Sequence, residues 1–316
     1  MKTGLIIGAS VIALGLALAI LTAYITYRMA FYSNRKNPRD PYLSLSGDVS
    51  ERKKKSKAYI DKLMTLPYES VAITSKDGLK LFARYYHARD GAPLEIQMHG
   101  YKSTSVHDFG GGALECISMG YNLLLVDQRA HGGSEGHVIS FGIKERMDAQ
   151  SWAEYAVERF GKDVKILLYG ISMGGATVLM ASELKLPESV VGIVADCPYS
   201  SARAIIAKIA RERHFSPALF MPFVKLGARI FGGFNLDECT ATDAVRNTKV
   251  PILIIHGEGD DFVPADMSRE IAESSDMAEL HTFPEAGHGL SFIYDYDRYM
   301  KIINEFHRKV LGEGEC

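Results

Sequence analysis

The chain has 316 residues, of which 47% are hydrophobic, so it fits one large folded domain with a short appendage and is not expected to be disordered. Its formal net charge of −2 conceals an asymmetry, because the first 60 residues carry ten Lys and Arg against three acids and the remainder is acidic. The four cysteines show neither a CxxC pair nor zinc-finger spacing, which indicates reduced thiols in a cytosolic setting and no disulfide framework or zinc site.

The chain opens with an uncharged apolar stretch from Leu5 to Ile25. A helix of about 20 such residues crosses the ~30 Å hydrocarbon core of a bilayer, so we expect residues 1–32 to form a single transmembrane anchor. A cleaved signal peptide is the alternative, although its apolar stretch would be shorter and its positive charge would come first. Aromatic and basic residues follow, namely Tyr24, Tyr27, Arg28, Tyr32, Arg35, Lys36 and Arg39. The positive-inside rule then favours a cytoplasmic body, with the extracytoplasmic side as the alternative.

Residues 33–67 are expected to form a basic linker and a helix. Residues 33–47 contain two prolines and no apolar period, which is typical of an exposed linker. Asp48 and Glu51 have the spacing of a helix-capping pair. Five basic residues follow, Arg52, Lys53, Lys54, Lys55 and Lys57, which would either bind anionic lipid or simply face the solvent. The apolar end of the helix, Tyr59, Ile60, Leu63, Met64 and Leu66, is expected to dock on the body.

Strand-like segments begin at residue 68, the start of the domain that we expect at 68–316. Residues 70–74 and 79–87 flank Asp77-Gly78, which is a hairpin signal. Five apolar runs follow at 94–99, 121–126, 164–169, 190–195 and 251–256, with helix-like stretches at 107–119, 142–160 and 173–185. Continuous apolar strands that alternate with helices predict a mostly parallel central sheet covered by helices on both faces.

Residues 199–248 interrupt this alternation of strands and helices and contain helix-like sequence patterns. They follow the carboxyl end of a predicted strand, where ligands enter such sheets, so we expect a small helical cap over the ligand entrance. The apolar residues of the cap would either line a pocket for an acyl group or pack against the body. They are Leu219, Phe220, Met221, Phe223, Val224, Leu226, Ile230 and Phe231.

The strand at 164–169 runs into a Gly-x-Ser-x-Gly motif, Gly170 to Gly174, and then into a helix-forming stretch. This context is that of a nucleophile elbow, a sharp turn that raises the hydroxyl of Ser172 above the sheet while the glycines give the backbone room. The elbow also directs the backbone N–H of Met173 toward a developing oxyanion. Ser172 is therefore the candidate nucleophile.

A serine nucleophile needs a base, and the base needs a carboxylate to orient it. Asp260 follows the strand at 251–256 on a glycine-containing loop, and it is the candidate acid, with the adjacent Asp261 as the alternative. His288 lies further on between two glycines and is the candidate base. The chain order Ser172, Asp260, His288 is the order that this architecture requires.

With these residues, the chain resembles the α/β-hydrolase superfamily over residues 68–311, in particular its bacterial membrane-anchored members of the serine aminopeptidase-like and esterase-like branch. His99-Gly100-Tyr101 matches the family's oxyanion loop, and residues 127–136 match its D-x-R-G-x-G-x-S-x-G run, with Ala130 in place of the first glycine. The resemblance implies that the backbone N–H of Tyr101 is the second oxyanion donor. The departure at Ala130 affects a structural turn and leaves the catalytic residues intact.

The sequence gives little support for a metal site, a nucleotide-binding site or a phosphate-binding loop. His99 and His256 each end a strand before a glycine and are expected to satisfy buried backbone groups. Four further histidines lack the spacing of metal ligands, namely His107, His131, His137 and His281. The chain has no P-loop and no G-x-G-x-x-G fingerprint, and Gly110-Gly111-Gly112 lacks the setting of a phosphate loop. We therefore expect no cofactor, no metal and no nucleic-acid partner.

The sequence favours a serine hydrolase that cleaves carboxylic esters through an acyl-enzyme, on a small acyl or lipid-like substrate beside the membrane. A serine peptidase or thioesterase is the nearest alternative, and a peptidase would use acidic cap residues such as Asp237, Glu238 and Asp243 to receive a substrate amine. A catalytically silent membrane scaffold of the same fold is the alternative from another class.

Overall fold

The computed structural model describes residues 2–34 and 50–312. The remainder, which includes most of the predicted linker and Asp48 of the predicted capping pair, lies outside the described residues.

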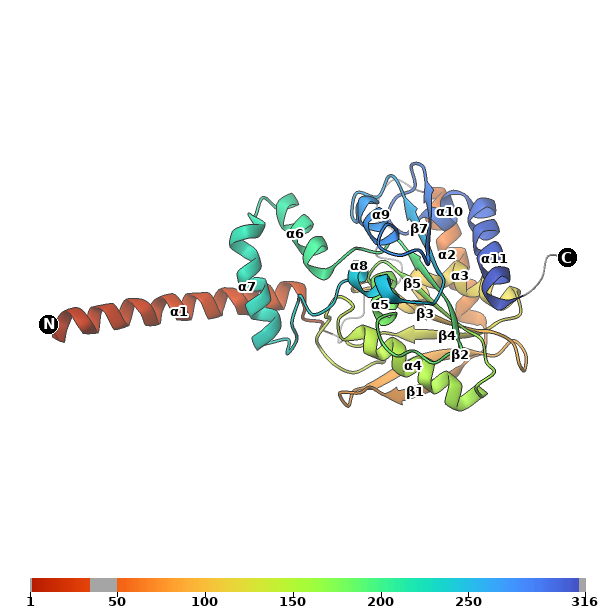
Figure 1. Ribbon diagram of the computed structural model, residues 1–316, viewed down its shortest axis with the longest axis horizontal. Helices are drawn as coiled ribbons and strands as arrows, with labels where there is room; N and C mark the ends of the chain where they lie inside the picture. Colours follow the sequence, from red (N-terminus) through yellow and green to blue (C-terminus); the bar gives the residue numbers. More distant parts are fainter. Residues whose placement is uncertain (1, 35–49, 313–316) are drawn as a thin grey trace.

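The core is an eight-stranded sheet with the strand order β1-β2-β4-β3-β5-β6-β7-β8 (Figure 1). β1 and β2 form the predicted hairpin, and β2 also pairs antiparallel with β4, whereas all later pairs are parallel. The mostly parallel sheet predicted from the apolar runs is thus confirmed. The strands are β1 Glu69–Thr74, β2 Lys80–Tyr86, β3 Leu94–Met98, β4 Asn122–Asp127, β5 Ile166–Ile171, β6 Val190–Asp196, β7 Ile252–Gly257 and β8 Ala278–Phe283.

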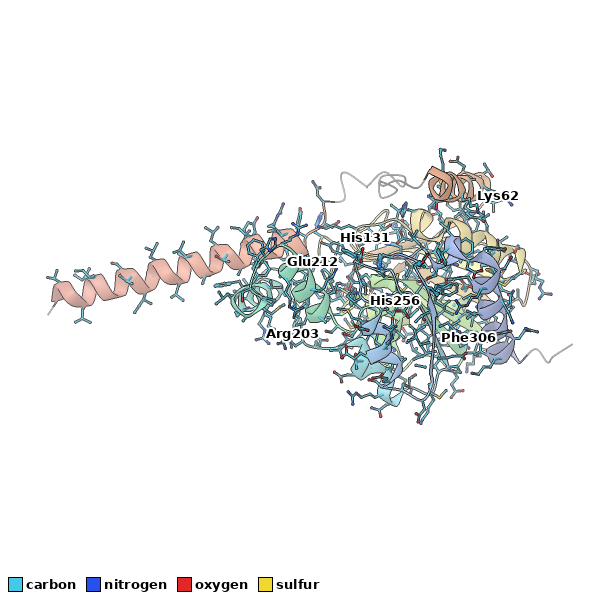
Figure 2. The ribbon with its side chains drawn as sticks, turned by 90° about the horizontal axis from the view of Figure 1, so that it is seen from above. Lys62, His131, Arg203, Glu212, His256 and Phe306 are labelled. Atoms are coloured by element: carbon cyan, nitrogen blue, oxygen red, sulfur yellow. The ribbon has the colours of Figure 1, made fainter. Side chains whose placement is uncertain are left out.

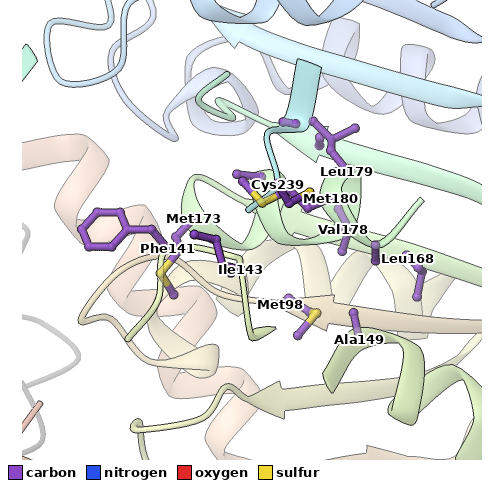
Figure 3. Close-up of a cluster of buried hydrophobic side chains, with 14 of the residues drawn as sticks. Met98, Phe141, Ile143, Ala149, Leu168, Met173, Val178, Leu179, Met180 and Cys239 are labelled. Atoms are coloured by element: carbon purple, nitrogen blue, oxygen red, sulfur yellow. The ribbon is translucent and has the colours of Figure 1, made fainter. Parts of the chain in front are cut away.

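Helices cover both faces of the sheet, because its central strands are apolar on both sides. In β4, Leu124 and Val126 join the hydrophobic cluster on the face of α4 and α5, which Figure 3 shows in close-up. Leu123 and Leu125 join the opposite cluster, on the face of α3 and α11. The body helices are α2 Ser50–Thr65, α3 Ser105–Ser118, α4 Glu145–Phe160, α5 Met173–Ala181, α9 Asp266–Ala272, α10 Ser291–Tyr294 and α11 Tyr296–Leu311.

The interruption between β6 and β7 is helical, as the sequence indicates. It contains α6 Ala202–Glu212, α7 Pro217–Ile230, the short α8 Ala241–Ala244 and a 3-10 turn at Val245–Asn247. α6 and α7 stand beside the body on the side from which α1 projects, whereas α8 packs on α5 (Figure 1).

α1 Lys2–Ala30 has two parts with different surroundings. Residues 5–18 are exposed and project away from the body (Figure 1). From Ala23 onward the helix is docked, with Ala23, Thr26 and Tyr27 buried at the spacing of one helical face. This face packs on α7. A side chain at Gly227 of α7 would overlap the carbonyl oxygen of Ala23, so the glycine allows the two helices to approach closely.

The chain after α1 remains attached to the body. Phe31 is fully buried, with edge-to-face ring contacts to Phe141 and Phe234. Tyr32 forms an isolated antiparallel bridge with Val138. The predicted apolar helix is therefore present, and its last turns belong to the folded body.

α2 docks on α3 through its apolar end, as expected for Ile60 and Leu63, which are buried. A side chain at Gly110 of α3 would meet Ile60, so the glycine allows the two helices to pack closely. Met64 does not dock: its side chain is 55% exposed and lies against Arg84 at the surface.

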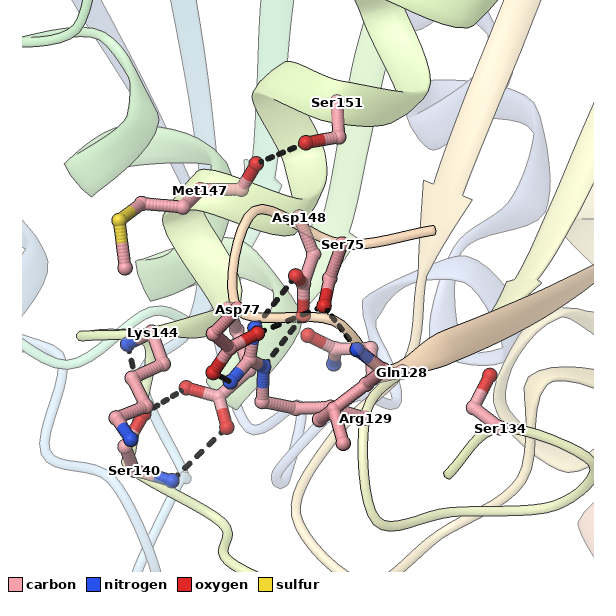
Figure 4. Close-up of polar contacts among 12 residues, drawn as sticks. Ser75, Asp77, Gln128, Arg129, Ser134, Ser140, Lys144, Met147, Asp148 and Ser151 are labelled. Carbon is pink, nitrogen blue, oxygen red and sulfur yellow. Dashed lines mark hydrogen bonds and ion pairs between the residues drawn. The ribbon is translucent and has the colours of Figure 1, made fainter. Parts of the chain in front are cut away.

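Arg129, two residues after the end of β4, links its own segment to α4 and to the turn between β1 and β2. Its guanidinium donates to Asp148 of α4 at 2.6 Å and to Asp77 of the hairpin turn at 2.8 Å (Figure 4). The hydrogen bonds from Arg129 lower the pKa of Asp77 to about 2. Ala130 next to it has a φ of +63°, a left-handed value that explains why a glycine is the usual residue there.

We predict that Asp148→Asn destabilises the protein by about 3 kcal/mol, because it leaves a buried guanidinium without one of its two carboxylates. Glu69→Gln, which removes the surface partner of Arg159, should cost at most about 1 kcal/mol. Urea denaturation of the full chain in detergent micelles measures both. Equal losses in the two variants would contradict the structural importance of the buried pair.

Candidate active site

Ser172 lies at the sharp turn between β5 and α5, and its backbone is strained. Its φ of +56° and ψ of −114° are values that residues with side chains seldom adopt. The turn forms because its neighbours are glycines: a side chain at Gly170 would overlap the Gly174 carbonyl, and one at Gly174 would overlap the carbonyl oxygen of Met98 in β3. The predicted elbow geometry is therefore present, with Ser172 nearly buried at the carboxyl edge of the sheet.

Ser172, His288 and Asp260 form a continuous hydrogen-bonded relay. His288 Nε2 lies 2.9 Å from Ser172 Oγ, and His288 Nδ1 lies 2.7 Å from Asp260 Oδ2. The three residues come from the loops after β5, β7 and β8, which meet at one edge because their strands are parallel.

Asp260 is held as a carboxylate by the groups around it. Burial alone would raise its pKa, but hydrogen bonds from His256 and His288, together with the backbone N–H of Val263, outweigh burial and hold the pKa of Asp260 well below its ordinary value. Oδ1 also accepts from the backbone N–H of Phe262 at 2.9 Å. Asp261, the alternative acid, is exposed, and its backbone carbonyl accepts a hydrogen bond from Lys208 Nζ.

His256 has a larger role than the sequence indicates. It lies within hydrogen-bond distance of the Val263 carbonyl, as expected for a buried backbone partner, at 2.8 Å. Its Nε2 also lies 3.2 Å from Asp260 Oδ2, and its Nδ1 lies 2.6 Å from Ser268 Oγ. In the sequence, His256 lies four residues before Asp260, at the end of the strand that Asp260 follows, and this spacing could have indicated the contact.

The two expected oxyanion donors come from two different segments that meet beside Ser172, the start of α5 and the loop after β3. Met173 is the first residue of α5, where backbone N–H groups have no acceptor within the helix. Tyr101 lies on the loop after β3, and Asp108 holds this loop: its carboxylate accepts from the Gly100 N–H at 2.6 Å and from Ser103 Oγ at 2.5 Å. The sequence gives no sign of this role of Asp108.

Two buried histidines hold the same loop against the chain after β4. His99 Nε2 accepts from the backbone N–H of Gln128 at 3.2 Å, which confirms the expectation that His99 satisfies backbone groups. His131 Nε2 accepts from the backbone N–H of Lys102 at 3.0 Å. Burial, followed by the effect of the neighbouring His99, lowers the pKa of His131 to about 3, so the ring stays neutral and able to accept.

A cavity of about 840 Å³ opens above Ser172 and His288. Its wall away from the sheet is mainly apolar and includes Met29, Ala30, Ile205, Ile206, Ile209 and Phe220. Of the eight apolar residues that the sequence suggested for a pocket, only Phe220 lines this cavity. Met221 and Val224 are buried in the core, and Leu219 and Ile230 are exposed, so packing and solvent account for most of that set.

Cys197 brings a third potential metal ligand near the relay, since its Sγ and ligand atoms of Asp260 and His288 lie within 4.8 Å of one another. Burial raises the pKa of the Cys197 thiol well above its ordinary value, and a protonated thiol is a poor metal ligand. His288 and Asp260 are already hydrogen-bonded to each other, so this cluster fits a proton relay better than a metal site.

Comparisons with known proteins agree with this geometry. Residues 98–301 match the model of a family described as "Alpha/beta hydrolase family". The uncharacterized protein YqkD of Bacillus subtilis is 24% identical over 60% of the chain, and the match spans 63% of that relative, less than two thirds of its length. The uncharacterized membrane protein YNL320W of Saccharomyces cerevisiae is 26% identical over 76% of this chain and 80% of its own.

Among solved structures, the esterase Pf2001 of Pyrococcus furiosus has a similar fold. It superimposes with a TM-score of 0.64 over 79% of this chain and 93% of its own, at 23% sequence identity.

Proposed function

The chain belongs to the alpha/beta hydrolase family, and we propose that it is a membrane-anchored serine esterase in which Ser172 is the nucleophile, His288 the general base and Asp260 the orienting acid. The observation that carries this proposal is the Ser172–His288–Asp260 relay at the base of an apolar cavity. The similar fold of the esterase Pf2001 is consistent with ester hydrolysis as the reaction.

The first half of the reaction follows from the relay. The Asp260 carboxylate accepts a hydrogen bond from the Nδ1–H group of His288, so Nε2 is left as the acceptor for the hydroxyl proton of Ser172. As Nε2 takes that proton, Ser172 Oγ bonds to the ester carbonyl carbon, and the carbonyl oxygen gains a negative charge. The backbone N–H groups of Met173 and Tyr101 are the donors proposed for this oxyanion.

In the second half, His288 acts first as a general acid toward the leaving alcohol and then as a general base toward water. His288 returns its proton to the leaving alcohol as the ester C–O bond breaks, which leaves an acyl-Ser172 intermediate. A water molecule then gives a proton to His288 and attacks the acyl carbon. Ser172 Oγ leaves with the proton from His288, and the products are a carboxylic acid and the regenerated enzyme.

The peptidase alternative has less support. The three acidic residues suggested as amine receivers already have other partners: Asp237 pairs with Lys225 at 2.6 Å, Glu238 with Arg146 at 2.9 Å, and Asp243 lies at the N-terminus of α8, where its carboxylate accepts from Thr240. None of the three lines the cavity. A silent scaffold is also less well supported, because the strained nucleophile and its relay are complete.

We also propose that α1 anchors the protein in a membrane and that the body faces the cytoplasm. Within the described residues, one helix is long and apolar enough to cross a bilayer, at Leu5–Ala30. Arg28 lies in the last turn of this helix and further basic residues follow it, whereas only Lys2 precedes it, and this bias favours a cytoplasmic body by the positive-inside rule. The relative named as a membrane protein is in agreement.

We predict that a membrane-impermeant fluorophosphonate probe labels the protein only in permeabilised cells, because the probe reacts with an activated serine and the body faces the cytoplasm. Ser172→Ala should abolish labelling in both preparations. Labelling of intact cells would overturn the orientation, and persistent labelling of Ser172→Ala would overturn the assignment of the nucleophile.

We predict that Asp260→Asn lowers kcat/KM for p-nitrophenyl butyrate by about 10³-fold to 10⁴-fold, because the amide no longer holds His288 in the required tautomer. Asp261→Asn is the matched control: it makes the same change one residue away, on an exposed side chain, and should leave the rate unchanged. A similar loss in both variants would contradict the assignment of Asp260.

A further inference from the structure

The cavity above Ser172 has one wall made by the membrane helix itself. Thr26, Met29 and Ala30, from the last two turns of α1, line the same cavity as Ser172 and His288. An anchor that only tethers the body would contribute nothing to this cavity. The last turns of α1 therefore belong to the candidate substrate site.

The position of this wall is fixed by specific contacts with the active-site loops. The Tyr101 hydroxyl donates to the carbonyl of Ala30 at 2.7 Å, which satisfies one of the carbonyls that lack a partner at the end of a helix. The Tyr101 ring packs on Phe141, which also contacts Phe31. On the other side, Thr26 Oγ donates to the Phe223 carbonyl of α7 at 3.1 Å. α1 is thus joined both to the oxyanion loop and to α7.

α6 and the start of α7 form the facing wall. Ile205 and Ile206 are buried, and together with the partly buried Ile209 they turn the apolar face of α6 toward the cavity. Phe220 of α7 stacks on Phe215 at 5.5 Å between ring centroids, and both rings line the cavity. The space between α1 and α6 is therefore bounded mainly by aliphatic and aromatic side chains, with Thr26 and Arg213 as its polar neighbours, and this lining suits a hydrocarbon chain.

The length of α1 places this space at the surface of the bilayer. The part of α1 before its first buried residue, residues 5–22, spans about 27 Å as a helix, close to the ~30 Å thickness of the hydrocarbon core. The docked turns from Ala23 onward therefore begin where the bilayer ends. α6 and α7 lie on this side of the body (Figures 1 and 2), and Phe215 and Leu219 at their junction are 51% and 76% exposed.

Resting on the proposed esterase function, we propose that α1, α6 and the start of α7 form a binding site for a long acyl chain, which a membrane lipid ester enters directly from the bilayer. The ester carbonyl lies at Ser172, and the chain runs between Met29 of α1 and Ile209 of α6. The exposed Phe215 and Leu219 contact the lipid surface beside the entrance. The anchor helix is then a determinant of specificity as well as a tether.

The test compares long and short esters on the full chain reconstituted in lipid nanodiscs. The quantity measured is the ratio of kcat/KM for p-nitrophenyl dodecanoate to kcat/KM for p-nitrophenyl butyrate, with fluorophosphonate labelling of Ser172 to count active sites. Met29→Trp and Ile209→Trp fill the proposed channel from opposite walls. Ile25→Trp is the matched control, because Ile25 lies one helical turn before Met29, has similar exposure (48% against 54%) and does not line the cavity.

We expect wild type and Ile25→Trp to favour the long ester, and we expect each channel variant to lower the ratio by about tenfold or more, because every methylene group excluded from an apolar site is worth about fourfold. A wild-type preference for the short ester, or an unchanged ratio in both channel variants, would overturn the acyl site while leaving the esterase proposal standing. Failure of the wild type to hydrolyse either ester would instead contradict the proposed function itself.

Discussion

The arrangement of this molecule depends on the strained turn at Ser172. A positive φ at a residue with a side chain persists only where the surrounding structure enforces it. Here the enforcing contact is between Gly174 and the carbonyl oxygen of Met98, so the start of α5 lies directly on β3. The same contact brings the loop after β3, which carries Tyr101, beside the serine. The strain at the elbow and the placement of the proposed oxyanion donors are thus two consequences of one close approach.

The polar groups of the site follow from the need to satisfy them once they are buried. Asp260 is nearly inaccessible to solvent and accepts from two backbone N–H groups and two histidine rings. Such a carboxylate stays ionised and rigid, which is what a base-orienting group needs. On the opposite side, Asp108 and the neutral His131 hold the loop of Tyr101 by its backbone. The orienting carboxylate and the loop that carries Tyr101 are therefore each held by hydrogen bonds to buried polar groups.

The sequence predicts well the features that have local signals. The hairpin at Asp77-Gly78, the continuous apolar strands and the elbow around Ser172 are all recognisable within a few residues, and the order of strands then places Asp260 and His288 at the same edge. The position of Asp260 relative to Asp261 is a matter of loop geometry, which the sequence leaves open between two adjacent carboxylates.

The features that escaped prediction depend on contacts between distant segments. The hydrogen bond from Thr26 to Phe223 joins residues 197 positions apart, and nothing in the apolar stretch marks where the exposed part of α1 ends and its docked part begins. For the same reason, the sequence suggested α7 for the pocket, whereas α6 and α1 contribute more of its apolar lining than α7 does. His256 and Asp108 act through partners that only the fold brings near.

The most direct test is an experimental structure of the full chain after reaction with a long-chain alkyl fluorophosphonate. The account predicts phosphorus bonded to Ser172 Oγ, its phosphonyl oxygen about 3 Å from the backbone nitrogens of Met173 and Tyr101, and the alkyl chain lying between α1 and α6. An adduct on another residue, or an alkyl chain directed away from α1, would contradict it.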